Sequence, residues 1–399
     1  MRIFIEGYDT TNWGDALMAA ASALLAGELQ PHAEIIFPRR LPFKPEHLEA
    51  ILAAIRYRAE PPARALWPFA KPRAEFEISA PALKADRGDA VLFCNGFIFG
   101  DFWRAKWIRA VARSMKRLNA RGVRTILMPQ SFGPFEDRDK AALVRMAVDN
   151  AALVCARDAR SLSYLQRLGC AAPLLPSIDY TGLLNNSSSF ALGGERFNRL
   201  VIIPNAKIGE RFGGAAEESY LRQLADLART VRNREGMRIV VLAHTEHKDD
   251  DLAARLAGLC EAGGVVRGDP LEMRRFIGGS RAVIASRFHG LKNALAQNVP
   301  ALSIGWSHKY TELMKVYGLS DYSVDVTSGP PLAQYFRRLL AAENALAEKL
   351  RAANERIADG PYAALRTEIG AVLSAQAPPA PQKSRIFRPF RAREAELAS

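Results

Sequence analysis

Short apolar segments alternate with longer amphipathic segments along most of the chain, which predicts repeated strand–helix units. In the first half, strands are predicted at residues 1–7, 90–94, 125–129, 153–156 and 172–178. Helices are predicted at 15–29, 104–120, 140–150 and 161–168, the last of them ended by Gly169. Because such units build a parallel sheet with helices on both faces, residues 1–184 are expected to form one Rossmann-like domain.

The polar run Asn185-Asn186-Ser187-Ser188-Ser189 interrupts this pattern and predicts an interdomain linker over residues 185–199. The pattern then resumes, with strands at 200–203, 238–243, 282–285 and 301–304 and helices at 217–233, 250–262, 291–297 and 311–317. Residues 200–330 are therefore predicted to form a second Rossmann-like domain. Residues 331–376 are rich in Ala, Leu, Glu and Arg and predict a helical segment that packs back across both domains. Residues 377–399 are expected to form a disordered, basic, Pro-rich tail.

The predicted fold is thus an α/β protein whose two parallel sheets face a cleft. Ligands of such folds bind outside the carboxyl ends of the strands, so the residues that follow the strands are the candidates for a site. Ser286, Arg287 and His289 follow one strand of the second domain, and His308 and Lys309 follow the next. If residues 286–289 are extended, Arg287 and His289 share one face. Arginine binds oxyanions and histidine exchanges protons near neutral pH, so this cluster predicts a small anion that is held and protonated.

The first domain offers further polar residues at strand ends. Asn12 and Gly14 lie where the first helix begins and where backbone N–H groups can face an anion, although Asp15 is also placed to cap that helix. Gln130 directly follows the strand at 125–129. Arg157 follows the strand at 153–156 and either reaches the cleft or pairs locally with Asp158.

Taken together, these motifs resemble the polysaccharide pyruvyl transferase family. The resemblance covers roughly residues 1–320 and rests on Asn12-Trp13-Gly14-Asp15, Gln130-Ser131-Phe132-Gly133-Pro134, Ala156-Arg157-Asp158 with Ser161 and Gly169, Asp179, Ser286-Arg287-Phe288-His289-Gly290 and His308-Lys309. It implies a GT-B-like fold, phosphoenolpyruvate as the donor and a cyclic pyruvate ketal on a sugar of an exopolysaccharide or cell-surface glycan as the product. The first domain would hold the acceptor and the second the donor. The sequence departs from the family at Asn95-Gly96-Phe97, where three glycines are frequent; Asn95 is expected to substitute by adopting an unusual backbone conformation.

The resemblance also implies roles for individual residues. His289 would protonate the methylene carbon of the donor, and Asp15 or Asp179 would serve as the base for the acceptor hydroxyls. The donor would be bound by Arg287 and Lys309 with Arg157, and the neighbouring donor-site candidates are His308, Ser286, Gln130, Asn12 and Gly14. Phosphoenolpyruvate is the donor substrate, and no metal and no cofactor are expected.

Composition adds expectations about the partners, the location and the surface of the protein. The net charge of +13 favours anionic partners, but no zinc-finger, RNP1-like or GXXG signature indicates a nucleic acid. The four cysteines lack ligand spacing, and no signal segment or apolar run of membrane-spanning length is present, so a cytoplasmic protein is expected. Residues 104–124 contain eight Lys or Arg and no Asp or Glu, next to several aromatic residues. This segment is either a peripheral contact with an anionic inner membrane face, where a lipid-linked oligosaccharide would be presented, or simply a solvated face.

Two other functions fit the same patterns. A GT-B-type glycosyltransferase that uses a nucleotide sugar has the same fold, and a non-enzymatic basic protein that binds glycans or lipids would share the charge. The acceptor sugar, the hydroxyl pair and the oligomeric state stay open.

Overall fold

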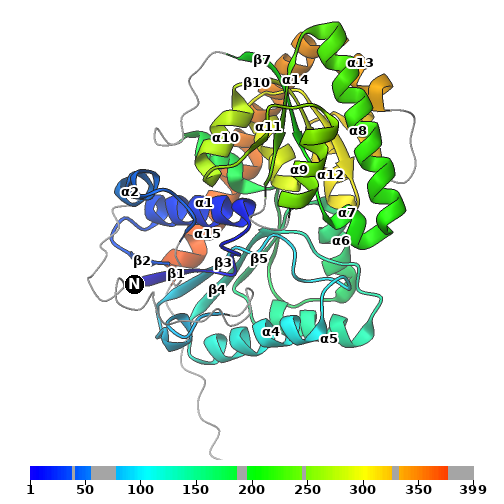
Figure 1. The fold of residues 1–399 in the computed structure, drawn as a ribbon. Coiled ribbons are helices and arrows are strands. Elements are labelled where there is room, and N and C mark those ends of the chain that lie inside the picture. The colour runs from blue at the N-terminus through cyan, green and yellow to red at the C-terminus, as the bar shows by residue number, and fades with distance from the viewer. Residues whose placement is uncertain (38–40, 55–77, 187–195, 245–248, 326–331, 376–399) are drawn as a thin grey trace, which may run out of the picture.

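The fold is built on two six-stranded parallel sheets (Figure 1). The computed structural model describes residues 1–37, 41–54, 78–186, 196–244, 249–325 and 332–375. The first sheet has the order β2 (Glu34–Ile36), β1 (Arg2–Glu6), β3 (Ala90–Phe93), β4 (Arg124–Gln130), β5 (Leu153–Ala156) and β6 (Leu174–Pro176). The second has the order β12 (Ser323–Asp325), β11 (Ala301–Gly305), β10 (Ser280–Ala285), β7 (Phe197–Ile203), β8 (Arg238–Leu242) and β9 (Val265–Val266). The predicted α/β class with two parallel sheets is confirmed.

Alternating side chains divide the core of the first sheet into two layers. Phe4, Val91 and Phe93 pack on one face together with the helix α4 (Ala105–Ala120), and α5 (Arg138–Val148) lies on the same side. Ile3 and Leu92 point to the other face, where they meet α1 (Trp13–Leu29). Helix α1 is buried almost all round because it lies between this sheet and the helices α10 (Pro270–Gly278) and α11 (Phe288–Ala296) of the second half. The hydrophobic core is therefore continuous from one sheet to the other.

Further helices in the first half, in the second half and in the C-terminal segment complete the layers. In the first half, α2 (Pro45–Ala54) and α6 (Ala159–Leu168) accompany the sheet; in the second half, α7 (Lys207–Phe212), α8 (Gly214–Glu235), α9 (Asp250–Leu259) and α12 (His308–Val316) do so. The chain then forms α13 (Leu332–Ala341), α14 (Glu343–Ile357), a π-helical turn (Ala358–Tyr362) and α15 (Ala363–Ser374). Figure 1 shows α15 returning to the first half, where it packs on α1 and β4.

One arginine fastens this last helix to the first sheet. Arg124 begins β4, and its Nη1 donates hydrogen bonds of 3.1, 3.0 and 2.6 Å to the carbonyl oxygens of Val372, Leu373 and Ala375. A cation at the carboxyl end of a helix satisfies carbonyl groups that have no partner within the helix and also complements the helix dipole.

The structure differs from the predicted elements mainly at their ends and in the short segments. β7 begins at Phe197, inside the predicted linker, and the helices at 138–148, 159–168, 288–296 and 308–316 each begin two or three residues earlier than expected. The elements β2, α2, α7, β9, α10 and β12 were not predicted, because short strands and short helices carry little periodic signal. Most of the linker and the whole tail at 377–399 lie outside the described residues.

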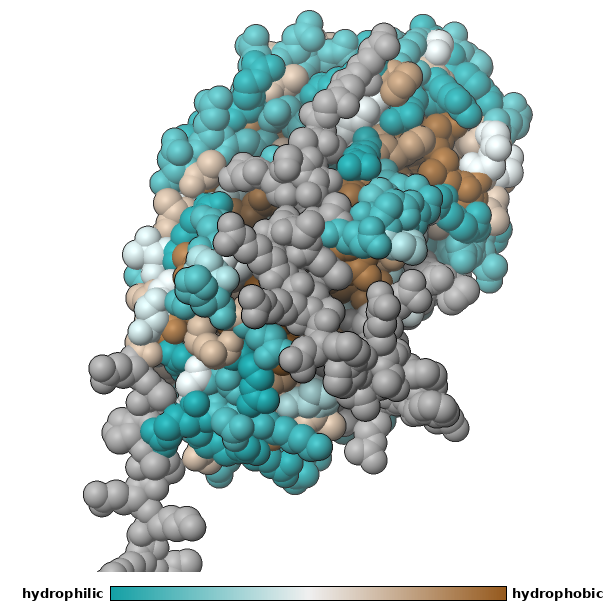
Figure 2. All heavy atoms as spheres, turned by 90° about the vertical axis from the view of Figure 1, so that its left-hand side faces the viewer, coloured by the Kyte–Doolittle hydropathy of each residue, from teal (hydrophilic) through white to brown (hydrophobic). Residues whose placement is uncertain are grey.

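The surface fits a globular protein whose hydrophobic residues are mostly buried. Figure 2 shows hydrophilic residues over most of one face, with hydrophobic residues gathered about its middle beside the residues drawn in grey. Within the described part of the chain, no helix is both long and apolar enough to cross a bilayer.

Candidate active site

A cavity of about 380 Å³ lies where the carboxyl ends of the two sheets meet. The loops after β1, β3 and β5 line it from the first half, and the segments after β7, β8, β10 and β11 line it from the second. This is where parallel sheets are expected to bind ligands. The cavity brings Asp15 and Arg157 together with Arg287, His289 and Lys309, as the sequence predicts.

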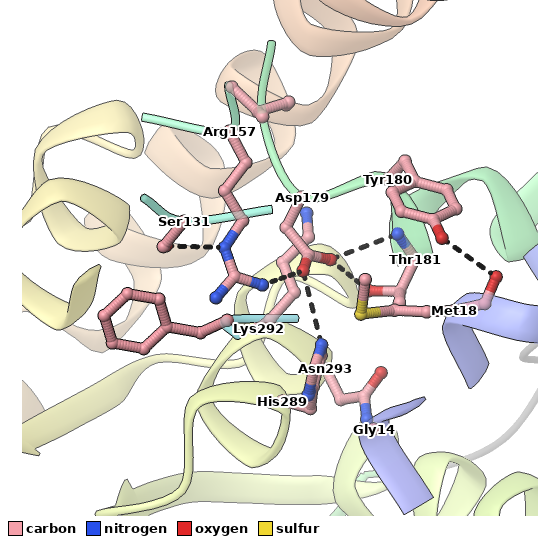
Figure 3. Close-up of polar contacts among 12 residues, drawn as sticks. Gly14, Met18, Ser131, Arg157, Asp179, Tyr180, Thr181, His289, Lys292 and Asn293 are labelled. Carbon is pink, nitrogen blue, oxygen red and sulfur yellow. Dashed lines mark hydrogen bonds and ion pairs between the residues drawn. The ribbon is translucent and has the colours of Figure 1, made fainter. Parts of the chain in front are cut away.

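His289 is held by a carboxylate from the other half of the chain. Its Nε2 lies 3.4 Å from Oδ2 of Asp179, a residue that follows β6 (Figure 3). The backbone N–H of Thr181 donates to the other oxygen of Asp179 at 3.1 Å and so helps to fix the carboxylate. Because Nε2 faces Asp179, Nδ1 is the nitrogen left for exchanging a proton with a ligand.

The local backbone around His289 is not what the sequence predicts. Residues 286–289 are not an extended run: Arg287 caps α11, and Phe288 and His289 form its first turn. The argument that alternation puts Arg287 and His289 on one face is therefore wrong. Both residues nevertheless line the cavity, because the helix starts immediately at the strand end.

Gly14 makes the close contact between α1 and α11 possible. A Cβ atom built on Gly14 would lie 1.8 Å from Nδ1 of His289, so no other residue fits without moving the imidazole (Figure 3). Gly14 was predicted to help expose amides to the donor, but its contact is with the catalytic candidate itself. The cap of α1 is Asn12, whose Oδ1 accepts a hydrogen bond from the Gly14 N–H at 3.0 Å, and not Asp15.

Arg157 also joins the Asp179 cluster. Its Nη1 lies 3.3 Å from Asp179 Oδ2, its Nε donates to Ser131 Oγ at 2.9 Å, and its guanidinium lies 4.2 Å from the centre of the Phe288 ring. The alternative of a local pair with Asp158 is wrong: Asp158 caps α6 by accepting a hydrogen bond from the Ser161 N–H at 2.7 Å.

The other two cations differ in how far they are neutralised. Arg287 forms an ion pair with Asp249, whose other oxygen is buried without a hydrogen bond. Around Lys309, the described residues place no carboxylate at ion-pair distance. Its Nζ instead lies 5.0–5.7 Å from the centres of four aromatic rings, those of Phe97, Phe288, Trp306 and Tyr310. Burial, together with Arg157 and Arg287, lowers the pKa of Lys309 to about 7.

The two candidate bases have opposite electrostatic environments. Burial and the nearby Asp9 carboxylate raise the pKa of Asp15 to about 7. Burial also opposes ionisation of Asp179, but His289, Arg157 and Lys292 outweigh it and hold the pKa of that carboxyl well below its usual range. Asp15 can therefore exchange a proton near neutral pH, whereas Asp179 stays ionised and is suited to orienting His289.

The surroundings of His289 disfavour its protonated form. Burial lowers the pKa of the imidazole; Asp179 opposes this effect, and Arg157 and Lys309 add to it. An anion placed in the cavity would offset the two cations and favour the protonated ring.

Four predicted donor-site residues do not line the cavity: Gly14, which contacts His289, and Gln130, Ser286 and His308. Gln130 is fully buried at the end of β4, and its Nε2 donates to the Met128 carbonyl at 3.4 Å. Ser286 Oγ accepts a hydrogen bond from the Tyr220 hydroxyl at 2.8 Å. His308 begins α12, with Nε2 3.8 Å from Asp158 Oδ1. Ser286 and His308 thus support residues that do face the cavity.

His244 and Asn95 are among the cavity residues that were not predicted as part of the site. His244 follows β8, lines the cavity and packs against Trp13 with ring centres 5.7 Å apart; its position just after a predicted strand was the available signal. Asn95 also lines the cavity. The left-handed backbone that was expected for Asn95 is not observed. Its side chain instead donates to the Gly7 carbonyl at 3.0 Å and accepts from the Phe97 N–H at 2.9 Å, so hydrogen bonds shape the loop.

Comparison with known proteins gives a family and a fold. The family model for polysaccharide pyruvyl transferases matches residues 12–308. A comparison with curated proteins gives no match. Among solved structures, UDP-GlcNAc 2-epimerase from Neisseria meningitidis, bound to UDP-GlcNAc, is 12% identical with a TM-score of 0.58, covering 94% of this chain and all of that one. The Methanocaldococcus jannaschii UDP-GlcNAc 2-epimerase is 10% identical with a TM-score of 0.54, covering 85% and 93%. This likeness confirms the GT-B-like fold.

Proposed function

This chain belongs to the polysaccharide pyruvyl transferase family and is a transferase, and we propose that it converts phosphoenolpyruvate and a sugar diol into a cyclic pyruvate ketal and phosphate. The observation that carries this proposal is the convergence of Arg157, Arg287 and Lys309 on one cavity with His289. A donor with a carboxylate and a phosphate needs several cations, and its methylene carbon needs an acid.

Donor binding would use the three cations in different ways. Lys309 is the cation that gains most from an anion, because its aromatic surroundings supply no counter-charge. The guanidinium groups of Arg157 and Arg287 are oriented by Asp179 and Asp249 and can each still donate to an oxyanion. At ~1.5–3 kcal/mol for each charge-assisted hydrogen bond, less the cost of association, the expected affinity is about micromolar to millimolar. No metal and no cofactor are required by this scheme.

The reaction then follows from the position of His289. The bound anion favours the imidazolium, which gives its proton to the methylene carbon of the donor and leaves a cationic carbon that carries the carboxylate and the phosphate. The first sugar hydroxyl attacks this carbon and loses its proton to Asp15. Phosphate leaves with the electrons of its C–O bond and takes up the proton held by Asp15, the second hydroxyl attacks, and its proton returns to His289. One phosphate is released for each ketal formed.

The first test separates chemistry from binding. With phosphoenolpyruvate and a panel of oligosaccharides that carry free diols, the protein should release phosphate. The variant His289→Ala should lose turnover by roughly 10²–10⁴-fold, while the donor still raises its melting temperature through Lys309 and the arginines. The matched control is His32→Ala, which changes an exposed histidine. Near-normal turnover by His289→Ala would exclude the proposed acid, and release of a nucleotide from a nucleotide sugar would favour the glycosyltransferase.

A membrane contact for the acceptor is the second part of the proposal. On α4, the side chains of Lys106, Arg109, Arg113, Lys116 and Arg117 are exposed, and the described residues place no carboxylate at ion-pair distance from any of them. Trp103 and Trp107, at the start of this helix, line the cavity. We infer that this face rests on an anionic lipid surface at the inner side of the membrane, which brings a lipid-linked oligosaccharide to the cavity.

Vesicle co-sedimentation tests this contact separately from activity. At about 1 kcal/mol for each basic residue near the surface, changing Arg109, Arg113 and Lys116 to glutamine should weaken binding to phosphatidylserine vesicles on the order of 100-fold. The same number of glutamines at Arg222, Arg234 and Arg238 provides the matched control. Absence of binding by the unchanged protein at low salt would remove the membrane contact but leave the transferase assignment intact.

A further inference from the structure

A buried lysine lies one helical turn beyond His289 and faces the same side of α11. Lys292 is 1% exposed, and its Nζ donates hydrogen bonds to the hydroxyls of Tyr317 at 2.7 Å and Tyr362 at 3.3 Å. A buried ammonium group is costly unless its surroundings compensate for it, so its presence beside the active site needs an explanation.

Tyr362 connects this lysine to the loop that carries Asp179. Its hydroxyl donates to the backbone carbonyl of Asp179 at 2.9 Å. A Cβ atom on Gly182 would lie 2.3 Å from the same hydroxyl, so the loop and the tyrosine fit closely together. Tyr362 ends the π-helical turn before α15, an irregularity that is frequent at functional sites.

A second contact fixes the other end of α11 to the C-terminal helices. Tyr317 donates to Asn354 Oδ1 at 3.0 Å, and Asn354 Nδ2 donates to the Leu295 carbonyl at 2.9 Å. The helix that carries His289 and the loop that carries Asp179 are therefore both tied to residues beyond 308, where the match to the family model ends.

The charge of Lys292 acts on the same pair. Lys292 helps to hold the pKa of Asp179 low, and burial lowers the pKa of Lys292 itself to about 8, so that it is mainly charged at neutral pH. Figure 3 shows Lys292 beside Asp179, with His289 on the other side of the carboxylate.

We infer that Tyr362 and Lys292 are positioning residues for the Asp179–His289 pair, so that the C-terminal helical segment completes the active site. This inference rests on the proposed role of His289 as the acid. Tyr362 fixes the position of the Asp179 backbone through the hydrogen bond from its hydroxyl to the Asp179 carbonyl. Lys292 keeps Asp179 ionised and offsets part of its negative charge. The pKa of His289 is therefore lower than it would be beside Asp179 alone.

The test reads the imidazole directly, without any substrate. In an NMR titration, Lys292→Met should raise the pKa of His289 by about half a unit or more, because a neighbouring positive charge is lost. Lys349→Met, which changes an exposed lysine on α14, should leave it unchanged. An unchanged His289 pKa in a folded Lys292→Met protein would overturn the role of Lys292.

Tyr362→Phe removes a single hydroxyl and keeps the test open if Lys292→Met does not fold. We expect kcat to fall roughly tenfold while KM for phosphoenolpyruvate stays within about twofold, since geometry and not donor contact is lost. Tyr335→Phe is the control, because the structure gives its hydroxyl no hydrogen bond among the described residues. Unchanged kcat in Tyr362→Phe, or equal loss in Tyr335→Phe, would overturn the inference. The pKa of His289 could shift as expected in Lys292→Met while neither the wild type nor the Tyr362→Phe variant consumes phosphoenolpyruvate. In that case the proposed function fails and the positioning contacts stand.

Discussion

The contact between Gly14 and His289 gives the sharpest prediction. In Gly14→Ala, the new methyl group would lie 1.8 Å from Nδ1 of His289, whereas an ordinary contact needs about 3.4 Å. Since Gly14 lies in the first turn of the buried helix α1, the imidazole has to move, by about 1.6 Å if it alone gives way. Its 3.4 Å contact with Asp179 is then lost.

A displacement of this size has separable effects on activity and stability. A misplacement of about 1 Å can cost on the order of 100-fold in rate, so we expect kcat for phosphate release to fall by at least that factor. Overpacking a buried site costs about 1–3 kcal/mol, so the free energy of unfolding in urea should fall within that range. Gly258→Ala is the control: Gly258 lies on α9 with open space around its Cβ, and alanine there should be neutral or stabilising. If Gly14→Ala retains more than about a tenth of the rate, His289 is not held as described or is not the acid.

Three further predictions concern charge. In Lys309→Met, the melting temperature without donor should rise, and the stabilisation by phosphoenolpyruvate should be lost. Because the pKa of Lys309 falls from 10.5 to about 7 on folding, the stability gained over the wild type should grow as pH falls from 10.5 to 7 and then level off. A destabilised variant would contradict this. The pH profile of kcat/KM should be a narrow bell near pH 7, with Asp15 ionising on the acid side and His289 and Lys309 losing their protons on the alkaline side; Asp15→Asn should remove the acid limb from whatever rate remains, and an unchanged limb would assign the base elsewhere. Arg124→Ala should lower the free energy of unfolding by about 3 kcal/mol, because three carbonyl groups at the end of α15 lose their donor, and a loss below about 0.5 kcal/mol would show that α15 is held by its apolar face alone.

The strand–helix pattern was sufficient to predict the fold class and the edge of the sheets at which the site lies. Arg157, Arg287 and Lys309 could be found because each lies in the segment that follows an apolar strand, and the topology then brings these segments together. The same reasoning failed for Gln130 because a position at a strand end does not say whether the side chain faces the cavity or the core.

The contacts between distant segments could not be predicted from local pattern. Asp179 and His289 are 110 residues apart, and nothing near either residue indicates that they meet. Gly14 was noticed as a turn residue, but the imidazole that requires it to be a glycine comes from the other half of the chain. The same holds for Lys292, which lies within ordinary helical sequence, and for Tyr362, which follows Gly360-Pro361; both become part of the site only through packing.

The central claim is that His289 protonates the methylene carbon of phosphoenolpyruvate on the way to a ketal. Its most direct test is to run the reaction in D₂O with an oligosaccharide acceptor and to examine the product by NMR and mass spectrometry. We predict a pyruvate ketal whose methyl group carries one deuterium, with one phosphate released for each ketal. A product without a ketal methyl group, or a ketal methyl group without deuterium, would contradict the account.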